Sequence, residues 1–99
     1  MPQALFFEFA EGVSTEDYNA VNSILGLDPA TGSGGWPGGL LSHTGAAGVD
    51  GGFVVFEVWD SRESQEAWMA STLGPALSQA GVAEPSRVEW LNVAGHYQP

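Results

Sequence analysis

The segment from Gly52 to Asp60 constrains the fold of this chain more than any other part. It is rich in β-branched and aromatic residues, which favours a β-strand. Side chains alternate across a strand, and here both sides are apolar. The two sets are Phe53, Val55, Glu57 and Trp59 on one side, and Val54, Phe56 and Val58 on the other. Because a small antiparallel sheet normally leaves one face in water, we expect a second copy of the protein to cover the second face.

The remaining patterns predict the order β-α-β-β-α-β. In chain order, the expected elements are a strand over 4–10, a helix that begins after Ser14 and ends at Gly26, a strand over 39–44, the strand over 52–60, a helix capped by Asp60 or Ser61, and a strand over 87–93. Gly74 and Pro75 are expected to break or kink the second helix. This order predicts an α+β, ferredoxin-like fold with a four-stranded antiparallel sheet, in a single domain over residues 1–99.

The segment 26–39 is a loop rich in glycine, with Trp36 as its lone large apolar side chain, expected to be exposed. Its glycines do not have the spacing of a phosphate-binding loop. Two interpretations stay open: a lid or pocket edge, and an ordinary long connection.

Charge and composition exclude several classes of function. Arg62 and Arg87 are the only cationic residues apart from histidine, and the formal net charge is −10. Nucleic acids and anionic membranes are therefore not expected as partners. No apolar run approaches the roughly 20 residues that span a bilayer, and no leader segment is evident, so a cytoplasmic protein is expected. Without cysteine, and with no recognisable ligand spacing, no metal site is predicted.

Three segments carry a resemblance to a known family. They are Leu40-Leu41-Ser42-His43, the strand end from Phe56 to Ser61 that continues into a helix, and the segment from Leu73 to Leu77. With the predicted element order, they resemble the dimeric α/β-barrel superfamily, in particular small proteins related to antibiotic-biosynthesis monooxygenases. The resemblance implies a homodimer, a pocket between each subunit's sheet and helices, and a small apolar or aromatic ligand.

The resemblance also bears on cofactors. Haem-degrading members pair an Asn on the first strand with a Trp and a helix His. Here the first strand carries Glu8, and the second helix has no histidine. No cofactor is therefore expected.

His43, Glu57 and Glu8 are the candidate catalytic residues. Imidazole is the usual general base near neutral pH, although His43 shares strand parity with Leu41 and so is also consistent with a core or interface histidine. The first and third strands of this fold are neighbours, so Glu8 and Glu57 are expected to approach on one face and supply an acid or base. The alternative is that each carboxylate lies at the rim or bonds to a polar neighbour.

Four aromatic residues are candidates for ligand binding. Trp59 and Trp68 would form a flat wall for a planar ligand, or else belong to the core. Tyr18 would supply a hydroxyl or simply pack, and Phe6 completes the set. His96 and Tyr97 follow the last strand and are expected at the surface, at a dimer seam or at the pocket mouth.

Three functions are consistent with these residues. The first is a cofactor-independent, monooxygenase-like or cyclase-like enzyme. The second is a binding protein without catalytic activity, and the third is a structural homodimer. In a monomer, Phe7, Phe9, Val54 and Phe56 would be wet, which is the reason to expect a dimer.

Overall fold

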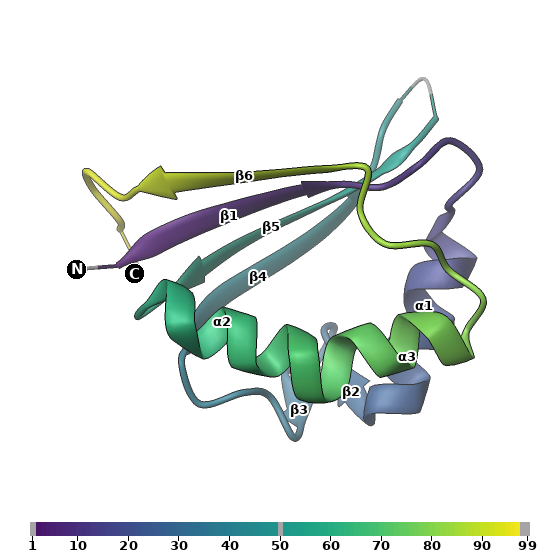
Figure 1. Ribbon diagram of the computed structural model, residues 1–99, viewed down its shortest axis with the longest axis horizontal. Helices are drawn as coiled ribbons and strands as arrows, with labels where there is room; N and C mark the ends of the chain where they lie inside the picture. Colours follow the sequence, from purple (N-terminus) through teal and green to yellow (C-terminus); the bar gives the residue numbers. More distant parts are fainter. Residues whose placement is uncertain (1, 50, 98–99) are drawn as a thin grey trace.

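Four antiparallel strands form one sheet in the computed structural model, which describes residues 2–49 and 51–97 (Figure 1). The elements are β1 (Gln3–Glu8), α1 (Thr15–Leu25), β2 (Leu27–Asp28), β3 (Ser33–Gly34), β4 (Leu40–Ala47), β5 (Phe53–Trp59), α2 (Arg62–Trp68), the π-helical segment η1 (Met69–Leu73), α3 (Gly74–Gln79) and β6 (Arg87–Asn92). The strand order is β4-β5-β1-β6, so the first strand lies between β5 and β6. The predicted α+β, ferredoxin-like arrangement is confirmed.

The first helix begins and ends where the sequence predicts. The hydroxyl of Ser14 accepts the Asp17 N–H, and the Asp17 carboxylate accepts the Ser14 N–H, which together form a capping box. The helix ends at Gly26, whose φ of 71° lies in the left-handed region that glycine adopts without strain. Both ends of α1 are therefore fixed by local capping residues.

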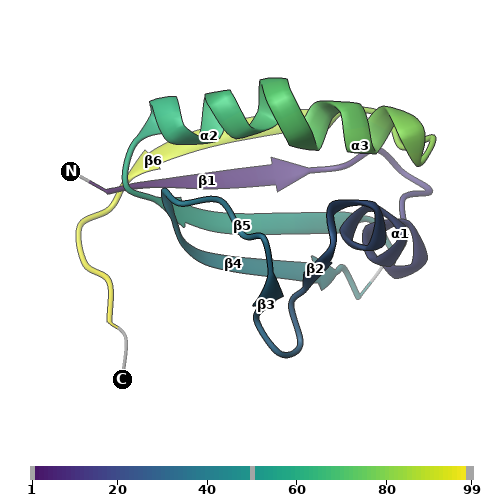
Figure 2. The same cartoon turned by 90° about the horizontal axis from the view of Figure 1, so that it is seen from below.

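The predicted loop over 26–39 contains a short hairpin, β2 and β3, beside α1 (Figure 2). Trp36 follows this hairpin and is half-buried, so the expectation of an exposed side chain is wrong. Its indole N–H donates to the Ser33 carbonyl at 3.0 Å, and its ring packs against His43. A bulky apolar ring gains more from this contact than from exposure to water.

The second helix is capped by Ser61, whose hydroxyl accepts the Ser64 N–H. Gly74 and Pro75 do not break it: α2, η1 and α3 follow one another in a single rod (Figure 1). The Gly74 N–H donates to the Met69 carbonyl five residues earlier, which is a π-helical bond. This wider turn lies next to Pro75, which has no N–H to donate to the helix. The expectation was a break or a kink, and the helix instead continues through a π-helical segment.

One face of the sheet packs against the helices. Leu5 pairs with Glu57, and Phe7 pairs with Val55, so these residues share the helix-facing side. Leu5 and Phe7 are almost completely buried there. The expectation that Phe7 would be wet in a monomer is therefore wrong. Phe7 lies on the helix-facing side of the sheet, whereas Phe56 lies on the other side.

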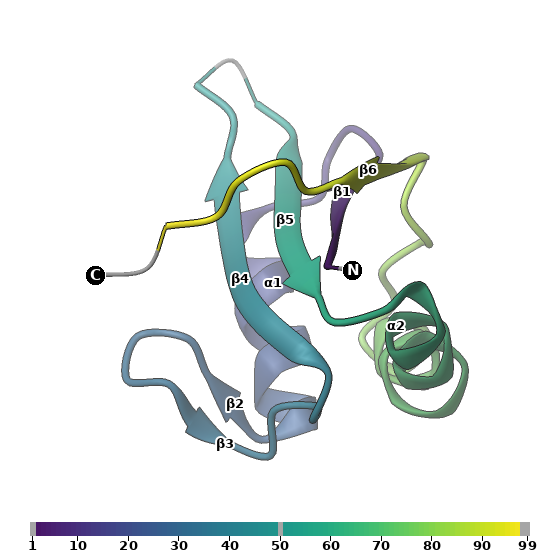
Figure 3. The ribbon, with the colours of Figure 1, turned by 90° about the vertical axis from the view of Figure 1, so that its left-hand side faces the viewer.

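The other face of the sheet has no helix over it among the described residues (Figures 1 and 3). Phe56 and Leu91 project from this outer face, and their exposed fractions are 41% and 43%. Within residues 2–49 and 51–97, every helix is too short or too polar to cross a bilayer.

Candidate functional site

A cavity of about 60 Å³ lies between the helix-facing side of the sheet, α1 and the second helix rod. Most of its wall is apolar. The sheet contributes Phe7, Phe53 and Val55, α1 contributes Val21, and the rod contributes Leu73 and Leu77. Against this background, a few polar side chains reach the cavity, and three of them are Tyr18, His43 and Glu57.

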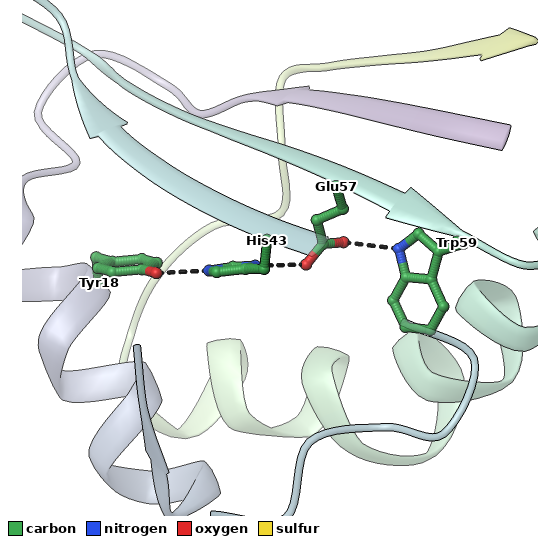
Figure 4. Close-up of polar contacts among 4 residues, drawn as sticks. All are labelled: Tyr18, His43, Glu57 and Trp59. Carbon is green, nitrogen blue, oxygen red and sulfur yellow. Dashed lines mark hydrogen bonds and ion pairs between the residues drawn. The ribbon is translucent and has the colours of Figure 1, made fainter. Parts of the chain in front are cut away.

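These three side chains form one hydrogen-bonded chain, which ends on Trp59 (Figure 4). The Tyr18 oxygen lies 2.5 Å from Nε2 of His43, and Nδ1 of His43 lies 2.7 Å from Oε2 of Glu57. The indole N–H of Trp59 donates to Oε1 of Glu57 at 3.0 Å. Both oxygens of the carboxylate are therefore occupied, and Glu57 is held in one orientation.

The partners assign a proton to each bond. Glu57 accepts on both oxygens, so His43 donates from Nδ1. In the tautomer with its proton on Nδ1, Nε2 of His43 accepts the Tyr18 O–H. A hydroxyl, an imidazole and a carboxylate in this order have the logic of a catalytic triad, in which the carboxylate fixes the tautomer of the base.

Gly45 allows Tyr18 to reach His43. Gly45 lies on β4 opposite Val55, so it faces the helices. A Cβ at this position would lie 2.6 Å from Cζ of Tyr18, which is closer than a side chain can approach. The Tyr18 ring therefore lies against the bare backbone of β4, and it also contacts the Phe53 ring at 4.8 Å between centroids.

The environment of Tyr18 favours its protonated form. Burial raises the pKa of the Tyr18 hydroxyl above its ordinary value of 10.0, and the Glu57 carboxylate raises it further. The Asn22 side chain lowers the pKa as a hydrogen-bond partner of the Tyr18 hydroxyl, although Nδ2 of Asn22 makes no hydrogen bond within 3.5 Å. At neutral pH the hydroxyl therefore carries its proton and can donate it to Nε2 of His43.

Trp36 separates this inner cavity from a second hollow at the surface. The outer hollow measures about 260 Å³, and the two spaces share Trp36, Leu40 and His43 as walls. The Trp36 and His43 ring centroids are 5.3 Å apart. An engineered protein cavity that binds benzene measures roughly 150 Å³. The inner cavity is smaller than this, so a ring compound must displace Trp36 or another side chain of the wall in order to bind.

The structure brings together His43, Glu57 and Tyr18, and Trp68 also lines the cavity. Glu8 does not join them. It pairs with Val54, whereas Glu57 pairs with Leu5, so the two carboxylates lie on opposite faces of the sheet. The expected approach of Glu8 and Glu57 is wrong because their positions have opposite parity.

Two of the aromatic candidates also lie elsewhere. Trp59 is completely buried and does not line the cavity, so the expectation that it contacts a ligand is wrong. Its indole N–H orients Glu57 instead. Phe6 lies on the outer face, with the Arg87 guanidinium 5.7 Å above its ring, because its parity is that of Phe56. His96 and Tyr97 are exposed after β6.

Sequence reasoning missed Asn22 and Gly45. Asn22 lies four residues after Tyr18, so both occupy the same face of α1, and this spacing could have indicated a second polar group in the pocket. Gly45 had no local signal, since its role depends on a ring from another element. Asn22 lines the cavity and is buried, with an exposed fraction of 7%.

Among the described residues, no three or more His, Cys, Asp or Glu side chains lie together in a way that could hold a metal ion. The two arginines do not line the cavity. Arg62 lies 5.2 Å from the centre of the Trp90 ring, and Arg87 lies over Phe6. The cavity wall therefore combines apolar side chains with two carboxylates, an imidazole, a phenol and the side-chain amide of Asn22.

The sequence matches no known family model and no functionally curated protein. Solved structures do share its fold. A putative antibiotic biosynthesis monooxygenase from Chloroflexus aurantiacus is 21% identical with a TM-score of 0.63, and the match covers 98% of each chain. SnoaB, a cofactor-independent oxygenase from Streptomyces nogalater, is 13% identical with a TM-score of 0.67, over 96% of this chain and 95% of the other.

A Streptomyces coelicolor monooxygenase in complex with the ligand Nanaomycin D is 20% identical with a TM-score of 0.53, over 99% of this chain and 90% of the other. The fold of this chain is thus the ferredoxin-like fold of antibiotic-biosynthesis-monooxygenase-like proteins, as the resemblance in sequence predicted.

Proposed function

We propose that this protein binds a small apolar or aromatic molecule in the inner cavity and removes a proton from it without a cofactor. The observation that carries this proposal is the chain of hydrogen bonds from Tyr18 through His43 to Glu57, whose members line a mostly apolar cavity. Solved structures of the same fold include a cofactor-independent oxygenase, which supports a reaction of this type. Monooxygenase-like chemistry would use dioxygen as the oxidant, and cyclase-like chemistry would need none.

The proton follows the hydrogen bonds. A C–H or O–H of the ligand gives its proton to the Tyr18 oxygen, while the Tyr18 hydroxyl gives its own proton to Nε2 of His43. The Glu57 carboxylate, 2.7 Å from Nδ1, stabilises the imidazolium that forms. The ligand is left as an enolate or phenolate. General-base catalysis of this kind contributes about 10²–10⁴-fold to a rate.

We further propose that two copies associate through the outer face of the sheet. Phe56 and Leu91 are exposed there, and Phe6 and Val54 lie on the same face. An apolar sheet face without a covering layer is unfavourable in water. A facing sheet from a second copy would remove this surface from solvent and form a barrel across the dimer.

The test uses cyclopentanone, a compact ketone, in D₂O. We expect the protein to accelerate deuterium exchange at the carbons beside the carbonyl, measured by proton NMR. His43→Gln should slow the exchange at least about 100-fold because it removes the base. His96→Gln is the matched control, since His96 is exposed in the C-terminal tail, and it should retain the wild-type rate.

Gly45→Ala provides a second test that alters no polar group. Its methyl group would occupy the position of the Tyr18 ring, so Tyr18 should leave His43 and the exchange rate should fall. Gly35→Ala is its control, because a Cβ at Gly35 contacts nothing within 4 Å. If cyclopentanone binds but wild-type protein gives no acceleration, the protein is a binding module and the catalytic proposal is wrong.

The size of the inner cavity favours a second candidate, a structural homodimer with a pocket closed by its own side chains. About 60 Å³ is far below the roughly 300–1,000 Å³ of typical ligand pockets. This candidate predicts that cyclopentanone changes no backbone or side-chain resonance of residues around the cavity. Chemical-shift changes confined to those residues would exclude it.

A further inference from the structure

We infer that the Asn22 side-chain amide is a specificity-determining donor, which requires a hydrogen-bond acceptor such as a ketone oxygen on the ligand. This inference rests on the proposed function, because it assigns a chemical class to the ligand of the same cavity. Asn22 makes none of the hydrogen bonds of the Tyr18–His43–Glu57 chain, although it lies close enough to the Tyr18 hydroxyl to affect that group.

Asn22 is an unusual residue for its position. It is 93% buried on α1 and lines the cavity beside apolar side chains such as Val21. Of the buried side-chain nitrogen and oxygen atoms within residues 2–49 and 51–97, Nδ2 of Asn22 is the one that has no hydrogen-bond partner. A buried donor without a partner destabilises a protein, and leucine, which is close in size, would avoid that penalty.

The surrounding charges restrict the acceptor. Glu57 lines the same cavity and Asp17 lies at its edge, whereas neither arginine reaches it. An anionic oxygen would meet two carboxylates there without a compensating cation, which is unfavourable. The acceptor that fits is therefore neutral, and a carbonyl oxygen is the simplest one.

The placement of Asn22 also connects recognition to the proposed reaction. Tyr18 and Asn22 are separated by one helical turn, so their side chains lie side by side on α1. A carbonyl oxygen bound to Nδ2 would place the adjacent C–H near the Tyr18 oxygen. The same N–H would then stabilise the negative charge that develops on the oxygen when the proton leaves.

The experiment compares cyclopentanone with methylenecyclopentane, in which a CH₂ group replaces the carbonyl oxygen. Binding to ¹⁵N-labelled wild-type protein is followed by NMR, including the side-chain amide resonance of Asn22. We expect the ketone to bind about tenfold more tightly, which is the effect of one hydrogen bond to an otherwise unpaired buried donor. The Asn22 amide resonance should move with the ketone and not with the alkene.

Asn22→Leu should bind the two probes equally, and Asn19→Leu, the same substitution on the exposed side of α1, should keep the preference for the ketone. Equal binding of both probes to wild-type protein would overturn the inference about Asn22 and leave the ligand pocket standing. Binding of neither probe would overturn both the inference and the proposed function. The wild-type comparison holds even if Asn22→Leu does not fold.

Discussion

At the level of single residues, the role of each polar side chain depends on its neighbours. His43 alone is consistent with a base, a core residue or an interface residue. Its contacts with Tyr18 on one nitrogen and Glu57 on the other make it an oriented imidazole in a cavity wall. Glu57 in turn depends on Trp59, which occupies its second oxygen. The candidate base is therefore a property of four side chains together.

The raised pKa of Tyr18 leads to a prediction about stability at high pH. Because the folded-state pKa lies above the unfolded value of 10.0, the neutral phenol contributes its full stability below pH 10.0, and that contribution is lost as the pH rises through the folded-state pKa. We expect the free energy of unfolding to decrease in this range. Denaturant unfolding at a series of pH values measures it, and tyrosinate absorbance reports the ionisation.

The composition leaves few other groups whose ionisation could interfere with this measurement. The chain has no lysine, and its only two tyrosines are Tyr18 and Tyr97, so few other groups ionise near pH 10. Tyr97→Phe should keep the decrease in stability, because Tyr97 is 85% exposed in the C-terminal tail. Tyr18→Phe should abolish it. A decrease that persists in Tyr18→Phe would contradict the assignment.

At the level of elements, the segment after the β2–β3 hairpin controls the size of the site. Trp36 forms a wall shared by the inner cavity and the outer hollow, and its indole is held by one hydrogen bond to Ser33. Two interpretations of the segment 26–39 were left open, a pocket edge and an ordinary connection. The position of Trp36 supports the pocket edge, and the β2–β3 hairpin is the part of the segment that resembles an ordinary connection.

Trp36→Ala should admit larger ligands. Removal of the indole would join the inner cavity to the outer hollow, so we expect acetophenone to bind at least about tenfold more tightly to the variant than to wild-type protein, measured by NMR titration. Cyclopentanone is the internal control, because a smaller molecule should gain less. Equal affinities of acetophenone for the two proteins would show that Trp36 is not the barrier.

At the level of the whole molecule, the sheet has two faces with different surroundings. The helices lie on one side of the sheet (Figure 1), and this side also carries the cavity. The other face exposes Phe56 and Leu91. The position of the site on the helix-facing side leaves the outer face available for association without blocking the cavity. The proposed site and the proposed interface thus lie on opposite sides of the sheet.

Phe56→Glu should disrupt the proposed homodimer. An unpaired carboxylate at an apolar interface would weaken association at least about 100-fold, measured by sedimentation at micromolar concentration. Ile24→Glu is the control, since Ile24 is 40% exposed on α1, nearly the same as the 41% of Phe56. Wild-type protein that sediments as a monomer would contradict the dimer.

Much of the fold could be predicted from local patterns. The strand over Phe53–Trp59, the cap at Ser14 and the stop at Gly26 each depend on residues that are near in sequence. Two expectations drawn from local patterns were wrong, and each has a physical reason. The helix continues past Pro75 because a π-helical turn adapts the bonding, and Phe7 is buried because strand pairing, not hydrophobicity, assigns its face.

The sequence by itself determined the element order, the apolar character of both sheet faces and the residue types available for chemistry, because these depend on periodicity and composition. Only the tertiary structure decided that Tyr18, His43 and Glu57 meet, that Glu8 faces away and that Asn22 is buried without a partner. Those outcomes depend on strand register and on contacts such as Gly45 with Tyr18, which join residues far apart in the chain.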